Sequence, residues 1–134
     1  MVRLGLVVAA FHAPITEQME SAGHEAAAER GAEIVETVRV PGAYDTPLAA
    51  DRLARREEID AVAVLGTIVT GETDHDQVIG HAAAGRLADV SLDRDTPVTL
   101  GITGPGMNAE QAYDRIENGG RAVESAIELA EELP

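Results

Sequence analysis

The chain of 134 residues contains no cysteine, and all of its ten basic residues are arginines, so it also lacks lysine. Without cysteine there are no disulfides, thiol nucleophiles, iron–sulfur clusters or cysteine zinc sites. Without lysine there is no Schiff-base lysine, no pyridoxal-phosphate attachment and no P-loop lysine. Only Ser21, Ser91 and Ser125 are serines, and none lies in the G-x-S-x-G turn of serine hydrolases.

Positive charge is scarce, since 24 acidic residues against 10 arginines give a formal net charge of −14. Such a chain repels nucleic acid and anionic membrane surfaces, so we expect neither as a partner. The acids are spread along the sequence, which also fits an ordinary solvated surface. An acidic excess without lysine favours a halophilic source, because at ~1 M salt the Debye length is about 3 Å and self-repulsion is screened.

Long hydrophobic runs are absent too. The longest, LGLVVAAF at residues 4–11, is too short to span a bilayer, and no clear small-residue cleavage site follows it. We therefore expect a cytoplasmic protein. The length suffices for one sizeable core, and no linker or repeat divides the chain, so we expect a single domain over residues 1–134.

Four short runs have the composition of β-strands, at residues 3–11, 33–40, 60–66 and 96–103. The first and third are nearly continuous aliphatic sequence, which is typical of central parallel strands covered on both faces. The second alternates more and is expected at an edge of the sheet.

Helical patterns separate these runs. One extends over residues 16–31, with Thr16 as a possible N-cap and Gly31 after its end, and another over 46–58, with Pro47 in its first turn. A third covers 76–93, and residues 109–133 form one bent helix or two. Alternating strands and helices predict an α/β, flavodoxin-like three-layer sandwich: a four-stranded parallel sheet of order 2-1-3-4 with helices on both faces.

Ligands of such sheets bind beyond the carboxyl ends of the strands, and unusual residues gather there. The first strand ends at Phe11, the only phenylalanine, which either packs in the core or offers its ring to a flat ligand. After the second strand, Tyr44 and Asp45 begin a helix. The Asp45 carboxylate either holds a sugar hydroxyl or caps that helix.

The third strand leads into GTIVTGETDHDQVIG, residues 66–80. Free amides from Gly71 to Thr73, before the start of a helix, predict an anion site. His75 lies beside it and is suited to move protons near neutral pH, although it could also only cap the helix.

A metal site is a minor alternative. Glu72, Asp74, His75 and Asp76 are all potential ligands, but His75 and His81 are six residues apart rather than four. The residues therefore leave a metal site as a minor possibility.

The fourth strand ends in GITGPGMN, whose glycines do not match a dinucleotide fingerprint. Arg115, in the helical pattern AEQAYDRI, and Arg121 are the later candidates for a guanidinium fork on a phosphate. Each is also open to the plainer interpretation of a surface arginine paired with nearby acids.

The order of these motifs resembles the lumazine synthase family. The shared features are a strand that ends in Phe, the turn V-P-G-A-aromatic-acid, the motif L-G-x-x-x-x-G-x-T-x-H before a helix, and E-Q-A-x-x-R near the end. The resemblance implies condensation of 5-amino-6-(D-ribitylamino)uracil with 3,4-dihydroxy-2-butanone 4-phosphate to 6,7-dimethyl-8-ribityllumazine, with loss of phosphate and water. It implies no metal and no organic cofactor, because the substrate's own amine is the nucleophile.

The resemblance also implies a role for each matching residue. It implies that Phe11 stacks on the pyrimidine and that the turn of Ala43, Tyr44 and Asp45 holds the ribityl chain. The backbone of Ile68 and Val69 is implied to read the pyrimidine edge. Glu72, Thr73 and Arg115 are implied to bind the phosphate, and His75 to transfer protons. Leu100 and Arg115 are expected from a neighbouring subunit, within a pentamer or an icosahedral 60-mer.

Several positions depart from the family pattern. His12 stands where Asn is common, Asp45 where Glu is usual, Thr70 where many members have a basic residue, and Leu100 where an aromatic is frequent. Two rival functions share the fold: an archaeal-type riboflavin synthase, which needs no phosphate site, and a non-catalytic shell or flavin-binding protein. The G-E-T-x-H loop and Arg115 favour the condensation.

Overall fold

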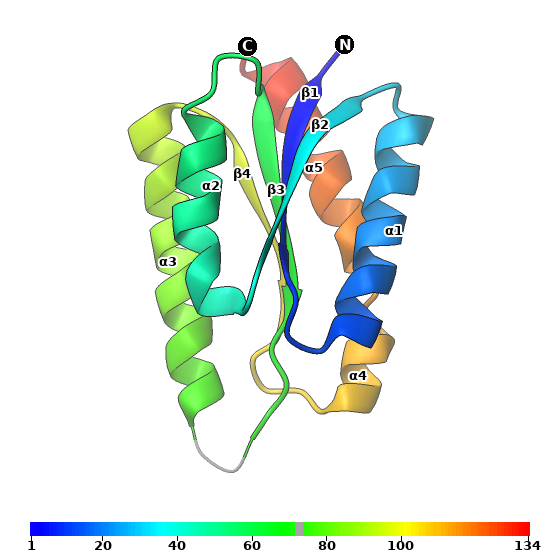
Figure 1. Cartoon of the computed structure of the whole chain (residues 1–134), viewed down its shortest axis with the longest axis vertical. Coiled ribbons are helices and arrows are strands. Elements are labelled where there is room, and N and C mark those ends of the chain that lie inside the picture. The colour runs from blue at the N-terminus through cyan, green and yellow to red at the C-terminus, as the bar shows by residue number, and fades with distance from the viewer. Residues whose placement is uncertain (72–73) are drawn as a thin grey trace.

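A computed structural model describes residues 1–71 and 74–134 of the chain (Figure 1). Its strands are β1 (Arg3–Ala9), β2 (Glu33–Val40), β3 (Ala61–Thr67) and β4 (Val98–Thr103). They form a parallel sheet in the order β2-β1-β3-β4, which confirms the predicted topology. The strand β2 lies on one side of β1, and β3 and then β4 lie on the other side. The strand order therefore reverses between β1 and β3.

Helices cover both faces of this sheet, as the flavodoxin-like prediction requires (Figure 1). The helices α2 (Thr46–Ala54) and α3 (His75–Arg94) lie on one face. On the other lie α1 (Ala13–Glu29) and α5 (Asn118–Glu132), with the short α4 (Ala109–Tyr113) near the carboxyl ends of the strands. A 3-10 turn, η1 (Ala43–Asp45), precedes α2.

The two central strands are buried on both faces and divide the core in two. Alternate side chains of β1 point to opposite faces, so Leu4, Leu6 and Val8 pack with α1 and α5 while Val7 packs with α2 and α3. All residues of β3 are buried. The edge strand β2 is only half-buried, as its alternating sequence predicts.

The start of α1 differs from the prediction of an N-cap at Thr16. The helix begins at Ala13 with His12 in the N-cap position, and Thr16 is buried in its first turn, where its hydroxyl donates to the Ala13 carbonyl at 3.4 Å. Pro14 explains the early start, because its fixed φ suits a first helical turn that needs no donor there. The expected end holds: Gly31 follows the helix with φ of 67°.

The C-terminal pattern resolves into two helices rather than one bent helix. As a result Arg115 lies in the turn between α4 and α5, not on the helix expected for AEQAYDRI. The helix α2 ends at Ala54, before the predicted 58, and α3 begins at His75, one residue early. Across these described residues no helix is both long and apolar enough to cross a membrane.

Helices α1 and α5 approach each other closely because glycines line the contact. A Cβ at Gly119 would lie 2.3 Å from the Met19 carbonyl oxygen, and one at Gly23 would lie 3.1 Å from a methyl of Val123. The Gly119 position therefore excludes any side chain unless one helix moves.

We expect Gly119→Ala to lower the free energy of unfolding by about 2 kcal/mol or more, since the added methyl meets backbone. Gly85→Ala is the matched control: nothing lies within 4 Å of its added Cβ, and an exposed helical Ala should gain up to ~1 kcal/mol. Denaturant unfolding of the two variants measures both. Equal stability of Gly119→Ala and the parent would contradict the close helix contact.

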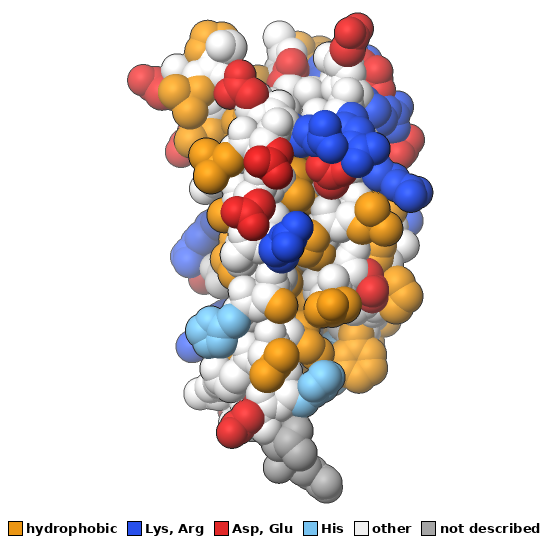
Figure 2. Space-filling view, turned by 90° about the vertical axis from the view of Figure 1, so that its left-hand side faces the viewer, with side chains coloured by type: hydrophobic (Ala, Val, Ile, Leu, Met, Phe, Trp, Pro, Cys, Tyr) orange, Lys and Arg blue, Asp and Glu red, His pale blue; other side chains and the backbone are white. Residues whose placement is uncertain are grey.

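An ion-pair network ties the end of α2 to the end of α3. The Asp51 carboxylate accepts from Arg94 at 2.8 Å and from Arg55 at 2.5 Å. Figure 2 looks onto the side of the molecule that carries α2 and α3, and it shows basic side chains gathered with acidic ones near the upper end. The hydrogen bond from Arg94 holds the pKa of the Asp51 carboxyl below its ordinary value, against a smaller opposing effect of burial.

Because this carboxyl has a lowered pKa in the folded state, its contribution to stability is present above the ordinary Asp pKa of about 4 and is lost as the pH falls through the folded-state value. We expect Asp51→Asn to cost about 1 kcal/mol at pH 7 in low salt and to flatten the pH dependence below about pH 4. Asp89→Asn, in a more exposed pair with Arg86, is the control and should cost little. Thermal unfolding against pH compares them, and identical profiles would refute the network.

Candidate active site

The loops beyond the four strands are tied together in two pairs at the carboxyl edge. After β1, the amides of Ala10 and Phe11 donate to the carbonyls of Val40 and Pro41 at 2.8 and 2.9 Å. After β3, the amide of Ile68 donates to Thr103 at 2.8 Å, and that of Thr70 donates to Met107 at 2.8 Å. The loops after β1 and β2 thus form one joined pair, and the loops after β3 and β4 form another. The two pairs flank the point between β1 and β3 where the strand order reverses, and ligands of such sheets bind at that point.

Phe11 is 68% exposed, so the interpretation of this ring as a core residue is wrong. It lies two residues beyond the end of β1 and contacts the His12 imidazole edge-on, with ring centroids 4.5 Å apart. An exposed aromatic ring at a strand end is available to stack on a flat ligand.

The turn after β2 presents one aromatic and one acid. Ala43 is buried, and its carbonyl accepts from the buried Thr46 hydroxyl at 2.7 Å, which fixes the turn. Tyr44 is 68% exposed. Asp45 occupies the N-cap position of α2, but its carboxylate makes no cap bond there and instead accepts from the Gly42 amide at 3.0 Å. A carboxylate has about four lone-pair sites, so this leaves acceptor capacity for a hydroxyl.

The loop between β3 and α3 leads from the core to the edge. Ile68 is buried and Val69 half-buried, while Gly71 is exposed with open space around it. Glu72 and Thr73, the predicted phosphate-binding residues, lie outside the described residues. His75 is exposed and is the first residue of α3, so it stands at the positive end of that helix.

The loop after β4 supports the loop after β3, and the sequence patterns did not indicate this. A Cβ at Gly104 would lie 2.2 Å from the Ile68 carbonyl oxygen, so only glycine fits there. Beneath, the buried hydroxyl of Thr103 donates to that of Thr67 at 3.0 Å. The glycines of GPGMN thus serve close backbone approach.

Leu100 lies in the middle of β4, three residues before the strand ends, so it is not at the carboxyl edge with Phe11. It is 54% exposed and lies in a shallow groove with Arg121 and Ser125 of α5. Within one chain, Leu100 therefore does not lie with the other predicted substrate contacts.

The two candidate arginines differ in their partners. Arg121 pairs with Glu117 at 3.1 Å, so the plainer interpretation of a surface ion pair holds for it. Arg115 donates to the Gln111 carbonyl at 2.9 Å, and no carboxylate in residues 1–71 or 74–134 pairs with it. Its positive charge is thus available to an anion.

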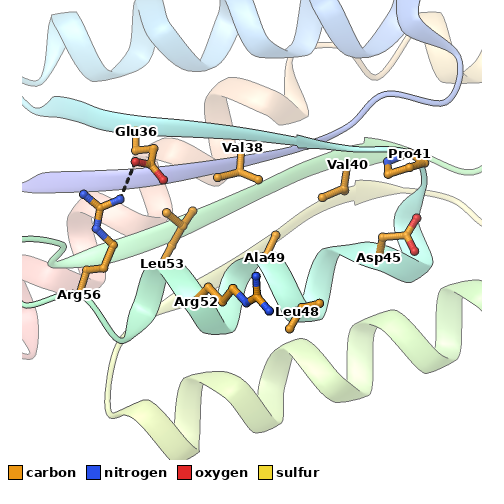
Figure 3. A pocket seen from close by; sticks show the side chains of 10 residues that line it. All are labelled: Glu36, Val38, Val40, Pro41, Asp45, Leu48, Ala49, Arg52, Leu53 and Arg56. Atoms are coloured by element: carbon orange, nitrogen blue, oxygen red, sulfur yellow. Dashed lines mark ion pairs between the residues drawn. The ribbon is translucent and has the colours of Figure 1, made fainter.

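A groove of about 430 Å³ runs between β2 and α2 (Figure 3). Val38, Val40 and Leu53 form apolar walls, and the Glu36–Arg56 ion pair at 2.6 Å stands at one end. Pro41 and Asp45 stand at the other end, so the groove opens next to the turn after β2. In the described ranges no three His, Asp or Glu side chains gather in a possible metal site.

The fold is that of an α/β protein of flavodoxin-like architecture, and the candidate site residues Phe11, Asp45 and His75 gather near the carboxyl edge of its sheet. The family model described as 6,7-dimethyl-8-ribityllumazine synthase matches residues 1–133. Proteins of that name are 64% identical in Halobacterium salinarum, over 99% of this chain and 100% of the relative, and 62% identical in Halorubrum lacusprofundi, over 99% of each. One from Methanocaldococcus jannaschii is 44% identical over 99% of this chain and 94% of the relative. The chain belongs to the 6,7-dimethyl-8-ribityllumazine synthase family.

Proposed function

We propose that the chain catalyses the condensation of 5-amino-6-(D-ribitylamino)uracil with 3,4-dihydroxy-2-butanone 4-phosphate, the penultimate step of riboflavin biosynthesis. The products are 6,7-dimethyl-8-ribityllumazine, phosphate and water. The observation that carries the proposal is family membership over nearly the whole chain, joined to an exposed ring, an exposed acid and an exposed histidine at one edge. The enzyme is a transferase that acts through imine formation, phosphate elimination and cyclisation.

The pyrimidine substrate binds against Phe11 in this proposal. The exposed ring offers a stacking surface, and the backbone of Ile68 and Val69 reads the polar edge of the pyrimidine. The close support of Ile68 by Gly104 keeps that backbone in one place. The turn of Ala43, Tyr44 and Asp45 holds the ribityl chain, with the Asp45 carboxylate accepting from a hydroxyl.

The phosphorylated substrate binds at the start of α3. Amides from Gly71 through Glu72 and Thr73 donate to the phosphate, and the positive helix end adds to the attraction. Arg115 supplies the guanidinium, which fits its lack of a carboxylate partner in the described part of the chain. His75 stands at the same helix end and transfers protons during imine formation and phosphate loss.

The complete site lies between two copies of the chain. Leu100, placed within β4, and Arg115, exposed between α4 and α5, are contributed by a neighbouring subunit. Exposed apolar side chains, including Leu48, Val78 and Leu92 on the α2–α3 face, leave surface for subunit contacts (Figure 2). We propose a pentamer or an icosahedral 60-mer, without cofactor or metal, in the cytoplasm of a halophile.

The direct test mixes both substrates with the purified protein in molar salt and follows the absorbance and green fluorescence of the lumazine. Product formation supports the proposal. An archaeal-type riboflavin synthase would instead form riboflavin rapidly from 6,7-dimethyl-8-ribityllumazine alone, and that result would overturn it. A non-catalytic shell or flavin-binding protein would give neither product. Light scattering in the same buffer gives the oligomer mass.

We expect His75→Ala to lower kcat by roughly 100-fold or more while the oligomer stays intact. The reason is that the change removes a proton carrier from the exposed first residue of α3 and leaves the core untouched. His81→Ala, at another exposed position of α3, is the matched control and should keep the parent kcat. Steady-state rates and light scattering measure both, and equal kcat for His75→Ala and the parent would show that another group carries the proton.

We expect Arg115→Ala to raise the KM for the phosphorylated substrate by roughly 10- to 100-fold, the value of a charge-assisted hydrogen bond. The KM for the pyrimidine should change little. Arg86→Ala, which removes an exposed arginine already paired with Asp89, controls for the loss of positive charge. A change confined to the pyrimidine KM would contradict the phosphate role.

A further inference from the structure

We propose that His12 is a positioning residue for Phe11: its imidazole holds the exposed ring in the orientation that stacks on the pyrimidine. This inference rests on the proposed function, because it assigns a partner to the ring that the substrate meets. The two side chains are neighbours in sequence, and the structure shows a specific ring contact between them.

The backbone of His12 adopts an unusual conformation. Its φ of 63° and ψ of 49° lie in the left-handed region, which non-glycine residues occupy rarely and glycine occupies without strain. The conformation turns the chain from the loop after β1 into α1, since the His12 carbonyl accepts from the amides of Ile15 at 2.9 Å and Thr16 at 3.2 Å. The turn requires a left-handed residue, but these contacts use only its backbone.

The side chain of His12 therefore needs a separate explanation. It makes no capping hydrogen bond to α1, although it occupies the N-cap position. It contacts the Phe11 ring instead, with centroids 4.5 Å apart and ring planes at 66°. Aromatic pairs favour this edge-to-face arrangement, in which the positive rim of one ring meets the negative face of the other.

The contact matters because the Phe11 ring is largely exposed, and His12 is the one aromatic partner that the described part of the chain gives it. The side chain is 68% exposed, whereas its backbone is fixed by the bond from the Phe11 amide to the Pro41 carbonyl at 2.9 Å. An exposed ring that must be ordered when a ligand stacks on it lowers affinity through the lost side-chain freedom. The half-buried imidazole orders the ring before the substrate arrives.

The test is a double-mutant cycle of His12→Gly with Phe11→Leu. Glycine keeps the left-handed turn and removes the ring, and His12→Asn is a second test variant, because asparagine also tolerates this backbone and keeps a polar side chain but has no ring. We expect both His12 variants to raise the KM for the pyrimidine by roughly 2- to 10-fold, the worth of such an aromatic pair. The KM for the phosphorylated substrate and the melting temperature should stay near the parent values.

In the Phe11→Leu background, His12→Gly should add no further increase in KM, because the imidazole acts only through the ring. Additive effects of the two substitutions would overturn the proposal. So would an unchanged KM in His12→Gly, or a normal KM in His12→Asn, which would mean that a polar side chain suffices.

A second measurement does not depend on activity. Phe11 is the only phenylalanine, so phenylalanine labelled with ¹³C gives one set of ring signals. We expect these ring resonances to shift in His12→Gly relative to the ligand-free parent, because the imidazole ring current is lost. Unshifted resonances would overturn the ring contact itself. A parent that makes no lumazine would instead refute the proposed function, while the resonances would still decide the contact.

Discussion

The burial of β1 and β3 on both faces is the constraint on which the rest of the structure depends. Two nearly continuous aliphatic strands find no solvent face, so helices must cover both sides of the sheet. Parallel strands covered in this way end at a common edge, and each is followed by a loop. The candidate site residues Phe11, Asp45 and His75 are all exposed at or just beyond this edge, where the chain leaves the buried strands.

Backbone hydrogen bonds join those loops to one another. Two hydrogen bonds join the loop after β1 to the loop after β2, and two more join the loop after β3 to the loop after β4, so the loops are fixed relative to one another. Where two loops approach most closely, Gly104 meets the Ile68 carbonyl without a Cβ between them. The proposed function needs positioning and proton transfer from the protein, and backbone that is held in this way provides the positioning.

Most of the few positive charges in this chain of net charge −14 are paired with acidic side chains. Most arginines stabilise the surface by pairing with acids: these are Arg30, Arg39, Arg55, Arg56, Arg86, Arg94 and Arg121. Arg115 differs, since it contacts a neutral carbonyl. Among the described residues Arg3 and Arg52 also lack a carboxylate partner, and of these three arginines Arg115 is the one that the proposed function assigns to the phosphate.

The sequence by itself determined the layered α/β fold, the strand order and the edge position of β2, because period, aliphatic content and turn residues are local signals. Residue type also selected His75 as a candidate proton carrier and Arg115 as a candidate phosphate-binding residue. Only the tertiary structure decided that Phe11 leaves the core, that α1 begins at a left-handed His12, that Arg115 lies between two helices, and that Leu100 is remote from the edge. These features depend on how loops meet beyond the strands and on which side chains find a partner there, and neither is encoded in local periodicity.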